Sequence, residues 1–401
     1  MYDELVNSLR ALDPKDENYA SSFVDTLLDA ARCRGASDLH VQPTPGGLEL
    51  RWRVDGVLSD LGTFSPGEAA NVVARLKVMA ELLTYRCDVP QEGRIRTDKI
   101  NADVRVCTFP TLHGERAVIR LFAQQLQFRS LAELRLPDSI ATRLGELLGE
   151  TAGAILVCGP AVSGKTTTLH ACLHHLAQHA PAARSIVTLE DPIEVAIDGV
   201  TQSQVNHSAG FDLAVGLRSV LRQDPEVIMI GEIRDAATAQ VAMQAALTGQ
   251  LVLSSFHAGS AAEAIGRLMD MPVEPYMLRS GVLAVVYQRL VRRLCSCARP
   301  TEAPDELLGL EVTGAHVAVG CQQCAGTGYV GRTLLAEMLT LEPCAVGNAV
   351  LERADVAQIE QLAIRGGMVD RWSRALEAVQ QGITSPAEVR RVLGFARNLA
   401  S

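Results

Sequence analysis

The sequence predicts an α/β protein, in which a small α+β domain precedes a larger domain built on an open, mainly parallel sheet. Two observations predict this class. Continuous apolar runs typical of buried strands recur at 154–157, 185–189, 227–230 and 251–257, and each is followed by polar or charged residues. Nearer the start, apolar and charged residues alternate over 48–55, which is typical of a strand with one buried face. The length of 401 residues allows two or three such domains.

The composition is that of an ordinary globular protein, because 48% of the residues are hydrophobic and 21% are charged. A net charge of −9 argues against direct contact with nucleic acid, so no nucleic-acid partner is expected. Met1–Val6 lacks the basic and apolar regions of a signal peptide. Because no apolar run approaches the roughly 20 residues that cross a bilayer, we expect a cytoplasmic protein.

The N-terminal part predicts an arm over residues 1–20 and a small α+β domain over 21–122, in which a helix covers about 19–34. Further elements predicted in this domain are a strand over 48–54, a hairpin turn at Asp55-Gly56, a helix over 72–83 and strands at 104–106 and 117–119. The polar segment 123–138, which contains a proline, predicts a linker.

Three arginines of the small domain are candidates for phosphate contacts: Arg94, Arg105 and Arg120. The planar guanidinium group can donate two parallel hydrogen bonds to a phosphate, which makes arginine well suited to this task. The residues alone leave the alternative open that these arginines are solvated or salt-bridged.

The larger domain, predicted over 139–340, contains a glycine-rich loop at 158–167 that matches the pattern G-x-x-x-x-G-K-[ST]. In such a loop the backbone N–H groups surround a polyphosphate, Lys165 reaches the outer phosphates, and Thr166 offers its hydroxyl to Mg²⁺. A helix predicted over 167–178 would point its N-terminus at the anion. The predicted nucleotide-binding residues of the loop are Gly159, Pro160, Ala161, Ser163, Gly164, Lys165, Thr166 and Thr167.

Acidic residues and a histidine follow the later strands of this domain. Glu190, Asp191 and Glu194 are candidates for positioning a water molecule or Mg²⁺, and a solvated acidic turn is the alternative. Glu232 ends the next strand, where a carboxylate typically orients hydrated Mg²⁺. His257 ends a third strand and is a candidate γ-phosphate sensor or a satisfied structural histidine.

Two cysteine pairs lie further along the chain, Cys295 with Cys297 and Cys321 with Cys324. Such pairs predict a tetrahedral Zn²⁺ site, although four reduced thiols are the alternative in a cytoplasmic protein. Ahead of them, the basic cluster of Arg289, Arg292 and Arg293 predicts a solvated helix face, with a docking surface as the alternative. Residues 341–401 show helical spacing of apolar residues and predict a small helical subdomain.

In their order along the chain, these motifs resemble those of the secretion ATPase superfamily, in particular the branch that powers type II secretion and type IV pilus assembly. The likeness extends over about residues 20–394. Besides the phosphate loop and the cysteine pairs, it rests on Gly35–His40, Arg53–Val57, Gly93-Arg94, Glu190–Glu194, Gly231–Asp235, Leu251–His257 and Gly328–Arg332. It implies a RecA-like ATPase domain with a zinc loop over 295–324, preceded by a PAS-like α+β domain.

The resemblance also implies a mechanism. Six subunits would form a ring, with ATP and Mg²⁺ between the two domains of each subunit. Glu194 would activate the attacking water, Glu232 would act through Mg²⁺, and His257 would sense the γ-phosphate. The arginines implied to line the nucleotide cleft are Arg94, Arg105 and Arg120. The motor would work at the cytoplasmic face of the inner membrane, on a platform protein, and would contact the membrane only through partners.

The sequence departs from the family pattern in several places. Gln250 stands where many relatives have a histidine, Phe256–Gly259 replaces a Leu-His-Thr-Asn run, and the first cysteine pair is short by one residue. The membrane-docking domain of many relatives is expected to be missing or reduced to residues 1–20. The paired cysteines favour an assembly or secretion motor over a retraction motor. The alternatives are an ATPase of a DNA uptake or transfer machine and a weakly hydrolysing nucleotide-binding scaffold.

Overall fold

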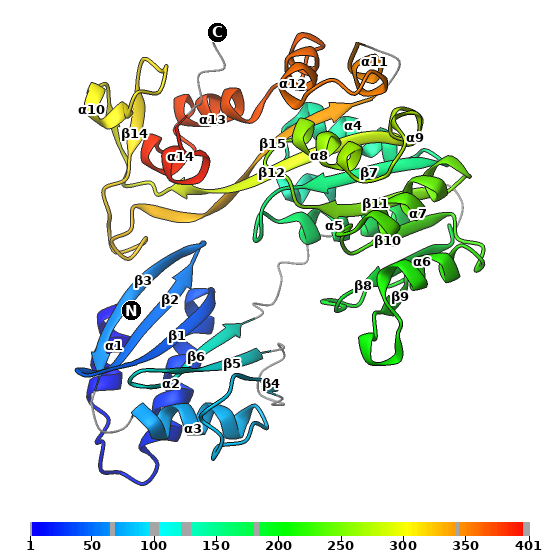
Figure 1. Cartoon of the computed structure of the whole chain (residues 1–401). Helices are drawn as coiled ribbons and strands as arrows, with labels where there is room; N and C mark the ends of the chain where they lie inside the picture. Colours follow the sequence, from blue (N-terminus) through cyan, green and yellow to red (C-terminus); the bar gives the residue numbers. More distant parts are fainter. Residues whose placement is uncertain are drawn as a thin grey trace. The chain divides into compact units, whose positions relative to one another are not determined.

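The computed structural model describes residues 2–64, 69–95, 104–121, 130–179, 184–341 and 345–395. The chain forms two compact units (Figure 1). The first consists of Met1–Leu126 together with Cys321–Val330, and the second of Gln127–Gly320 together with Gly331–Ser401. Each unit has a sheet and a hydrophobic core of its own, so each is described by itself.

The sheet of the first unit has six strands in the order β3-β2-β1-β6-β5-β4, and all neighbouring strands are antiparallel. The strands are β1 (Ala36–Thr44), β2 (Gly47–Val54), β3 (Val57–Phe64), β4 (Gln91–Ile95), β5 (Val104–Thr111) and β6 (Gly114–Leu121). Buried and partly exposed residues alternate along most of β1, because one face of the sheet is covered and the other is not.

Three helices of the first unit share one core with the buried side chains of the sheet. They are α1 (Tyr2–Arg10), α2 (Tyr19–Arg34) and α3 (Ala69–Met79). The structure does not show the arm that was predicted over residues 1–20, because a helix, α1, begins at Tyr2. Leu5, Val6 and Leu9 lie on one side of α1 and are buried in that core, so α1 belongs to the folded unit.

The sheet of the second unit has seven strands in the order β15-β12-β7-β11-β10-β8-β9, and from β12 to β9 all neighbours are parallel. The strands are β7 (Gly153–Cys158), β8 (Ile186–Glu190), β9 (Thr201–Gln204), β10 (Val227–Ile230), β11 (Leu251–Phe256), β12 (Val282–Leu294) and β15 (Tyr329–Thr340). The predicted strands at 154–157, 185–189, 227–230 and 251–257 are therefore the centre of this sheet.

Helices cover both faces of this sheet, which explains why its central strands are apolar throughout. One face is covered by η1 (Leu131–Leu134), α4 (Asp138–Leu148) and α5 (Lys165–His179). The other is covered by α6 (Leu213–Val220), α7 (Ala236–Leu247), α8 (Ala261–Asp270), α9 (Pro275–Gly281), α11 (Ala345–Leu351) and α12 (Val356–Arg365). Side chains of β7 alternate between the two cores, with Leu156 on one side and Val157 on the other.

The segment predicted as a linker, 123–138, is only partly among the described residues, which resume at Ser130. From Ser130 onward the segment is not irregular, because it contains the short helix η1 and leads into α4. Leu131, Leu134 and Leu136 are buried in the core beside α5, so these residues form part of the second unit.

The insertion between the cysteine pairs and the end of the chain add a small fourth core. It is formed by α10 (Pro304–Leu307), β14 (Ala315–Val317), α13 (Arg371–Gln380) and α14 (Pro386–Leu393), together with Val291 of β12 and Leu335 of β15. Strand β13 (Arg299–Thr301) pairs with β14 beside it. The helix face predicted from Arg289, Arg292 and Arg293 is wrong, because all three lie on strand β12. Arg292 pairs there with the fully buried Glu388 of α14, at 2.7 Å between Nη2 and Oε2.

Within the described part of the chain, none of the helices combines the length and the apolar character that are needed to span a bilayer.

Candidate active site

The glycine-rich loop connects β7 to α5 and is packed closely against β12. Gly159 has φ 148° and Gly164 has φ 90°, conformations that residues with a side chain rarely adopt. A Cβ atom at Gly159 would lie 2.5 Å from the carbonyl oxygen of Gln288, so a larger residue would displace the loop from the strand. The backbone geometry thus explains why glycine stands at both positions.

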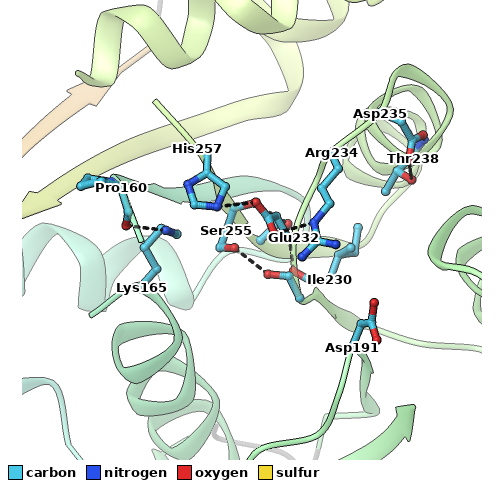
Figure 2. A network of polar contacts seen from close by, with 12 residues as sticks. Pro160, Lys165, Asp191, Ile230, Glu232, Arg234, Asp235, Thr238, Ser255 and His257 are labelled. Carbon is cyan, nitrogen blue, oxygen red and sulfur yellow. Dashed lines mark hydrogen bonds and ion pairs between the residues drawn. The ribbon is translucent and has the colours of Figure 1, made fainter. Parts of the chain in front are cut away.

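Lys165 begins α5, and its side chain extends into this loop (Figure 2). The Nζ atom donates hydrogen bonds to the carbonyl oxygens of Gly159, at 2.9 Å, and Pro160, at 2.8 Å. Burial lowers the pKa of Lys165, while the charge of the nearby Glu232 carboxylate acts in the opposite sense. The ammonium group is therefore buried at the mouth of the loop, next to an acidic strand end.

Gln288 holds the backbone of the glycine-rich loop by a hydrogen bond from β12. The sequence analysis did not predict a role for this residue. Its side chain is fully buried on β12, where Nε2 donates to the carbonyl oxygen of Ser163 at 3.1 Å. Its Oε1 accepts a hydrogen bond from the hydroxyl of Thr168 at 3.0 Å. The one sequence signal was a neutral amide inside a strongly apolar strand, where an unpaired polar group would be costly.

Glu232 lies between two basic side chains at the carboxyl ends of β10 and β11 (Figure 2). Its Oε1 is 2.8 Å from Nε2 of His257, and its Oε2 accepts a hydrogen bond from Nε of Arg234 at 2.7 Å. Arg234 belongs to the acidic motif but was not predicted as a site residue. The contacts join the tips of two neighbouring strands through a single carboxylate.

Backbone contacts fix the same strand tips. The hydroxyl of Ser255 donates to the carbonyl oxygen of Gly231 at 2.6 Å. Asp235 caps α7 by accepting a hydrogen bond from the backbone N–H of Thr238 at 2.8 Å. The position of Glu232 is thus set by the strand before it and by the capped helix after it.

The three acidic residues after β8 differ in their surroundings. Glu190 is buried and accepts hydrogen bonds from Thr188 Oγ1 at 2.7 Å and Gln202 Nε2 at 2.9 Å. Burial on its own would raise the pKa of Glu190, but the nearby His170 ring, 3.6 Å away, and hydrogen bonds from Thr188 and Gln202 hold it below its ordinary value. Glu190 is therefore an ionised group held in place by the protein.

Asp191 and Glu194, in contrast, are exposed. One oxygen of Asp191 lies 3.2 Å from Nε2 of His207. Exposed carboxylates beside a cavity remain accessible to water and to a solvated cation, which is what a water-activating or metal-orienting group requires.

A cavity of about 240 Å³ in the second unit brings eight of the predicted site residues together. The predicted site residues that line it are Ala161, Lys165, Thr166, Glu190, Asp191, Glu194, Glu232 and His257. They come from the ends of neighbouring parallel strands and from the start of α5, as expected for a ligand site at the carboxyl edge of an open α/β sheet. Gly159, Pro160, Ser163, Gly164 and Thr167 complete the adjoining loop and the first turn of α5.

The three predicted arginines lie in the first unit, in one cross-strand row. Arg94 is paired in register with Arg105, and Arg105 with Arg120. The next residue of the row is Asp38 on β1, which is 7% exposed and accepts a hydrogen bond from Nε of Arg120 at 3.0 Å. The row places three arginines at paired positions on adjacent strands.

The sulfur atoms of Cys295, Cys297, Cys321 and Cys324 all lie within 4.8 Å of one another. The sulfur of Cys324 accepts backbone hydrogen bonds from Cys321 and Gly328, each at 3.1 Å. Four sulfur ligands at this spacing, with N–H donors directed at one of them, fit a tetrahedral metal site. Although only one residue separates Cys295 from Cys297, both of their sulfur atoms lie close to the sulfur atoms of Cys321 and Cys324.

The fold and the cavity define a P-loop nucleotide-binding protein of the α/β class. Comparison with known sequences identifies the family: residues 13–391 match the profile described as "Type II/IV secretion system protein", and the chain belongs to this family. The resemblance drawn from the sequence motifs is thereby confirmed.

Two curated relatives illustrate the similarity. The type II secretion system ATPase E of Vibrio cholerae is 40% identical over 399 residues, which cover 97% of this chain and 78% of the relative. The type IV pilus assembly ATPase PilB of Thermus thermophilus is 37% identical over 385 residues, covering 93% of this chain but only 43% of the relative. This chain thus spans less than half the length of the pilus relative.

Among solved structures, the Legionella pneumophila ATPase DotB matches with a TM-score of 0.68 at 21% identity, covering 95% of this chain and 97% of DotB. This similarity confirms the predicted fold class.

Proposed function

We propose that this chain hydrolyses ATP as the motor subunit of a type II secretion or type IV pilus assembly machine. The observation that carries the proposal is the cavity of the second unit, where Lys165 and Thr166 meet carboxylates from two strand ends. The names of the curated relatives, which are ATPases of these two machines, support it. Purified protein is expected to hydrolyse ATP only when Mg²⁺ is present.

Each group of the cavity has a proposed task. The loop and Lys165 bind the phosphates, and Thr166 and Glu232 hold Mg²⁺, which when bound neutralises negative charge on the outer phosphates. Glu194 accepts a proton from the attacking water, and its exposure gives water access to it. His257 contacts the γ-phosphate while it stays beside Glu232. Glu190 and Asp191 line the side of the cavity that contacts the nucleotide.

The arginine row is proposed to stabilise charge that develops on the phosphates. We expect Arg94→Ala and Arg105→Ala each to lower kcat for ATP hydrolysis by about 100-fold, as is typical when a donor to a developing anion is lost. Arg51→Ala is a matched control, because Arg51 lies on β2 of the same sheet and forms an ion pair with Glu49. Turnover of the two row variants close to that of Arg51→Ala would refute the role of the row.

The four cysteines are proposed to hold a structural Zn²⁺. Protein purified without chelator is expected to contain about one zinc ion per chain by elemental analysis, and Cys324→Ser is expected to lose it. Thermal unfolding of that variant should begin at a lower temperature, because the metal stabilises a segment with little core of its own. Cys33→Ser is the control, since Cys33 is exposed and outside the cluster. Wild-type protein that purifies without chelator and still contains no zinc would contradict the proposal.

The subunits are proposed to form a hexameric ring that acts on an inner-membrane platform protein at the cytoplasmic face of the membrane. In this proposal, closure and opening of the two units around each nucleotide move the platform protein, and the membrane is contacted only through partners. No direct contact with nucleic acid is part of the proposal. Light scattering in the presence of ATP and Mg²⁺ measures the number of subunits directly.

A further inference from the structure

The segment His257–Ser260, between β11 and α8, connects the proposed phosphate sensor to a helix. Its last two residues, Gly259 and Ser260, are fixed by a reciprocal cap with Glu263. Ser260 Oγ accepts a hydrogen bond from the backbone N–H of Glu263 at 3.0 Å, and Glu263 Oε2 accepts one from the N–H of Gly259 at 3.0 Å. The cap fixes the direction in which the segment enters α8.

The start of α8 is in turn fixed to the sheet. Glu337, a fully buried residue of β15, accepts a hydrogen bond from the N–H of Ala261 at 2.9 Å. The thiol of Cys158, at the end of β7, is 3.7 Å from the carbonyl oxygen of Ser260. Helix α8 is therefore a rigid support for side chains that reach back toward β11.

Arg267 is the side chain of α8 that reaches back to His257. Its Nη1 atom donates a hydrogen bond to the carbonyl oxygen of His257. Its guanidinium carbon lies 5.4 Å from the centroid of the Phe256 ring, at the end of β11. Arg267 thus contacts the residue before the sensor as well as the sensor's own backbone, from outside the cavity.

These contacts act on the residue that carries the imidazole. The imidazole of His257 lies 2.8 Å from Glu232, and the carbonyl group of the same residue is the one that Arg267 holds. A charge-assisted hydrogen bond is strong enough to select one orientation of an exposed turn. We propose that Arg267 is a positioning residue that holds His257 against Glu232 and toward the nucleotide. The proposal rests on the proposed function of this cavity.

Because Arg267 is exposed, its replacement should affect catalysis without unfolding the protein. We expect Arg267→Met to lower kcat by about 10- to 100-fold, as small misplacements of catalytic groups do, with KM for ATP and the thermal midpoint unchanged. Methionine keeps an unbranched chain over Phe256 but cannot donate a hydrogen bond. Arg267→Lys, which keeps a cationic donor, is expected to recover most of the activity.

The matched control is Arg353→Met, because Arg353 is also exposed and donates to a carbonyl oxygen of α8, that of Met269, at 3.5 Å. It is expected to leave kcat unchanged. A double-mutant cycle with His257→Ala then tests whether Arg267 acts through His257. The combined variant should be no slower than His257→Ala alone.

The outcomes separate this proposal from the function on which it rests. Loss of kcat in His257→Ala but not in Arg267→Met would overturn the positioning role and leave the motor intact. Multiplicative losses in the double variant would also overturn it, since Arg267 would then act independently of His257. Wild-type protein without ATP hydrolysis would instead remove the proposed function itself.

Discussion

Replacement of Lys165 by alanine is expected to lower ATP hydrolysis by about 100- to 1,000-fold, in the range measured when one preorganised donor to a developing anion is removed. Lys165 is 9% exposed, and its ammonium group is held at the loop mouth by two carbonyl oxygens, so it is already in place when phosphate arrives. Steady-state kinetics with saturating ATP and Mg²⁺ measures the effect.

Lys15→Ala is the control for this variant, because Lys15 is exposed between α1 and α2 and distant in sequence from the loop. It should hydrolyse ATP at the wild-type rate. If Lys165→Ala retained half or more of the wild-type turnover, the loop would not be the hydrolytic site.

Replacement of Glu388 by alanine is expected to have the largest effect on stability, about 3–5 kcal/mol, as for other buried charge pairs that lose one partner. Glu388 is fully buried and accepts hydrogen bonds from the backbone and the guanidinium of Arg292. Its loss leaves Arg292, which is 15% exposed, without its anion. Chemical denaturation measures the change in the free energy of unfolding.

The control for Glu388→Ala is Glu146→Ala, which removes an exposed ion pair with Arg143 on α4. Such surface pairs contribute about 0–1 kcal/mol, so this variant should remain close to the wild type. Equal stability of the two variants would show that the buried pair does not anchor α14 to β12.

The surroundings of Glu388 also predict that the free energy of unfolding depends on pH. Burial on its own would raise its pKa, but hydrogen bonds from Arg391 and Arg292 hold it below the ordinary value of 4.5. A carboxyl group with a lowered pKa in the folded state contributes stability that is fully present above pH 4.5 and is lost as the pH falls through the folded-state pKa. The free energy of unfolding should therefore decline in acid, and this decline should be smaller in Glu388→Gln.

The elements that the sequence predicted well are those with a strong local signal. The central strands of the second unit are continuous apolar runs because helices cover both faces of the sheet, and the loop before Lys165 requires glycine at fixed positions. Polar residues after parallel strands gather at one edge, so the cavity with Glu194, Glu232 and His257 also followed from the order of motifs.

The elements that the sequence analysis missed depend on partners distant in the chain. Helix α1 appears polar, but three of its residues meet a core formed mostly by later segments. Arg292 lies in a basic cluster, and only its contact with Glu388, 96 residues away, reveals a buried ion pair. Gln288 and Arg267 likewise have no motif of their own, because each acts on the backbone of a functional segment rather than on a ligand.

ATP turnover and nucleotide binding, measured side by side in wild-type protein and in Glu194→Gln, test the proposed motor most directly. We expect wild-type protein to hydrolyse ATP in the presence of Mg²⁺, and the variant to bind the nucleotide equally well but to hydrolyse it at least about 100-fold more slowly. Wild-type turnover by Glu194→Gln would contradict the proposed assignment of this cavity.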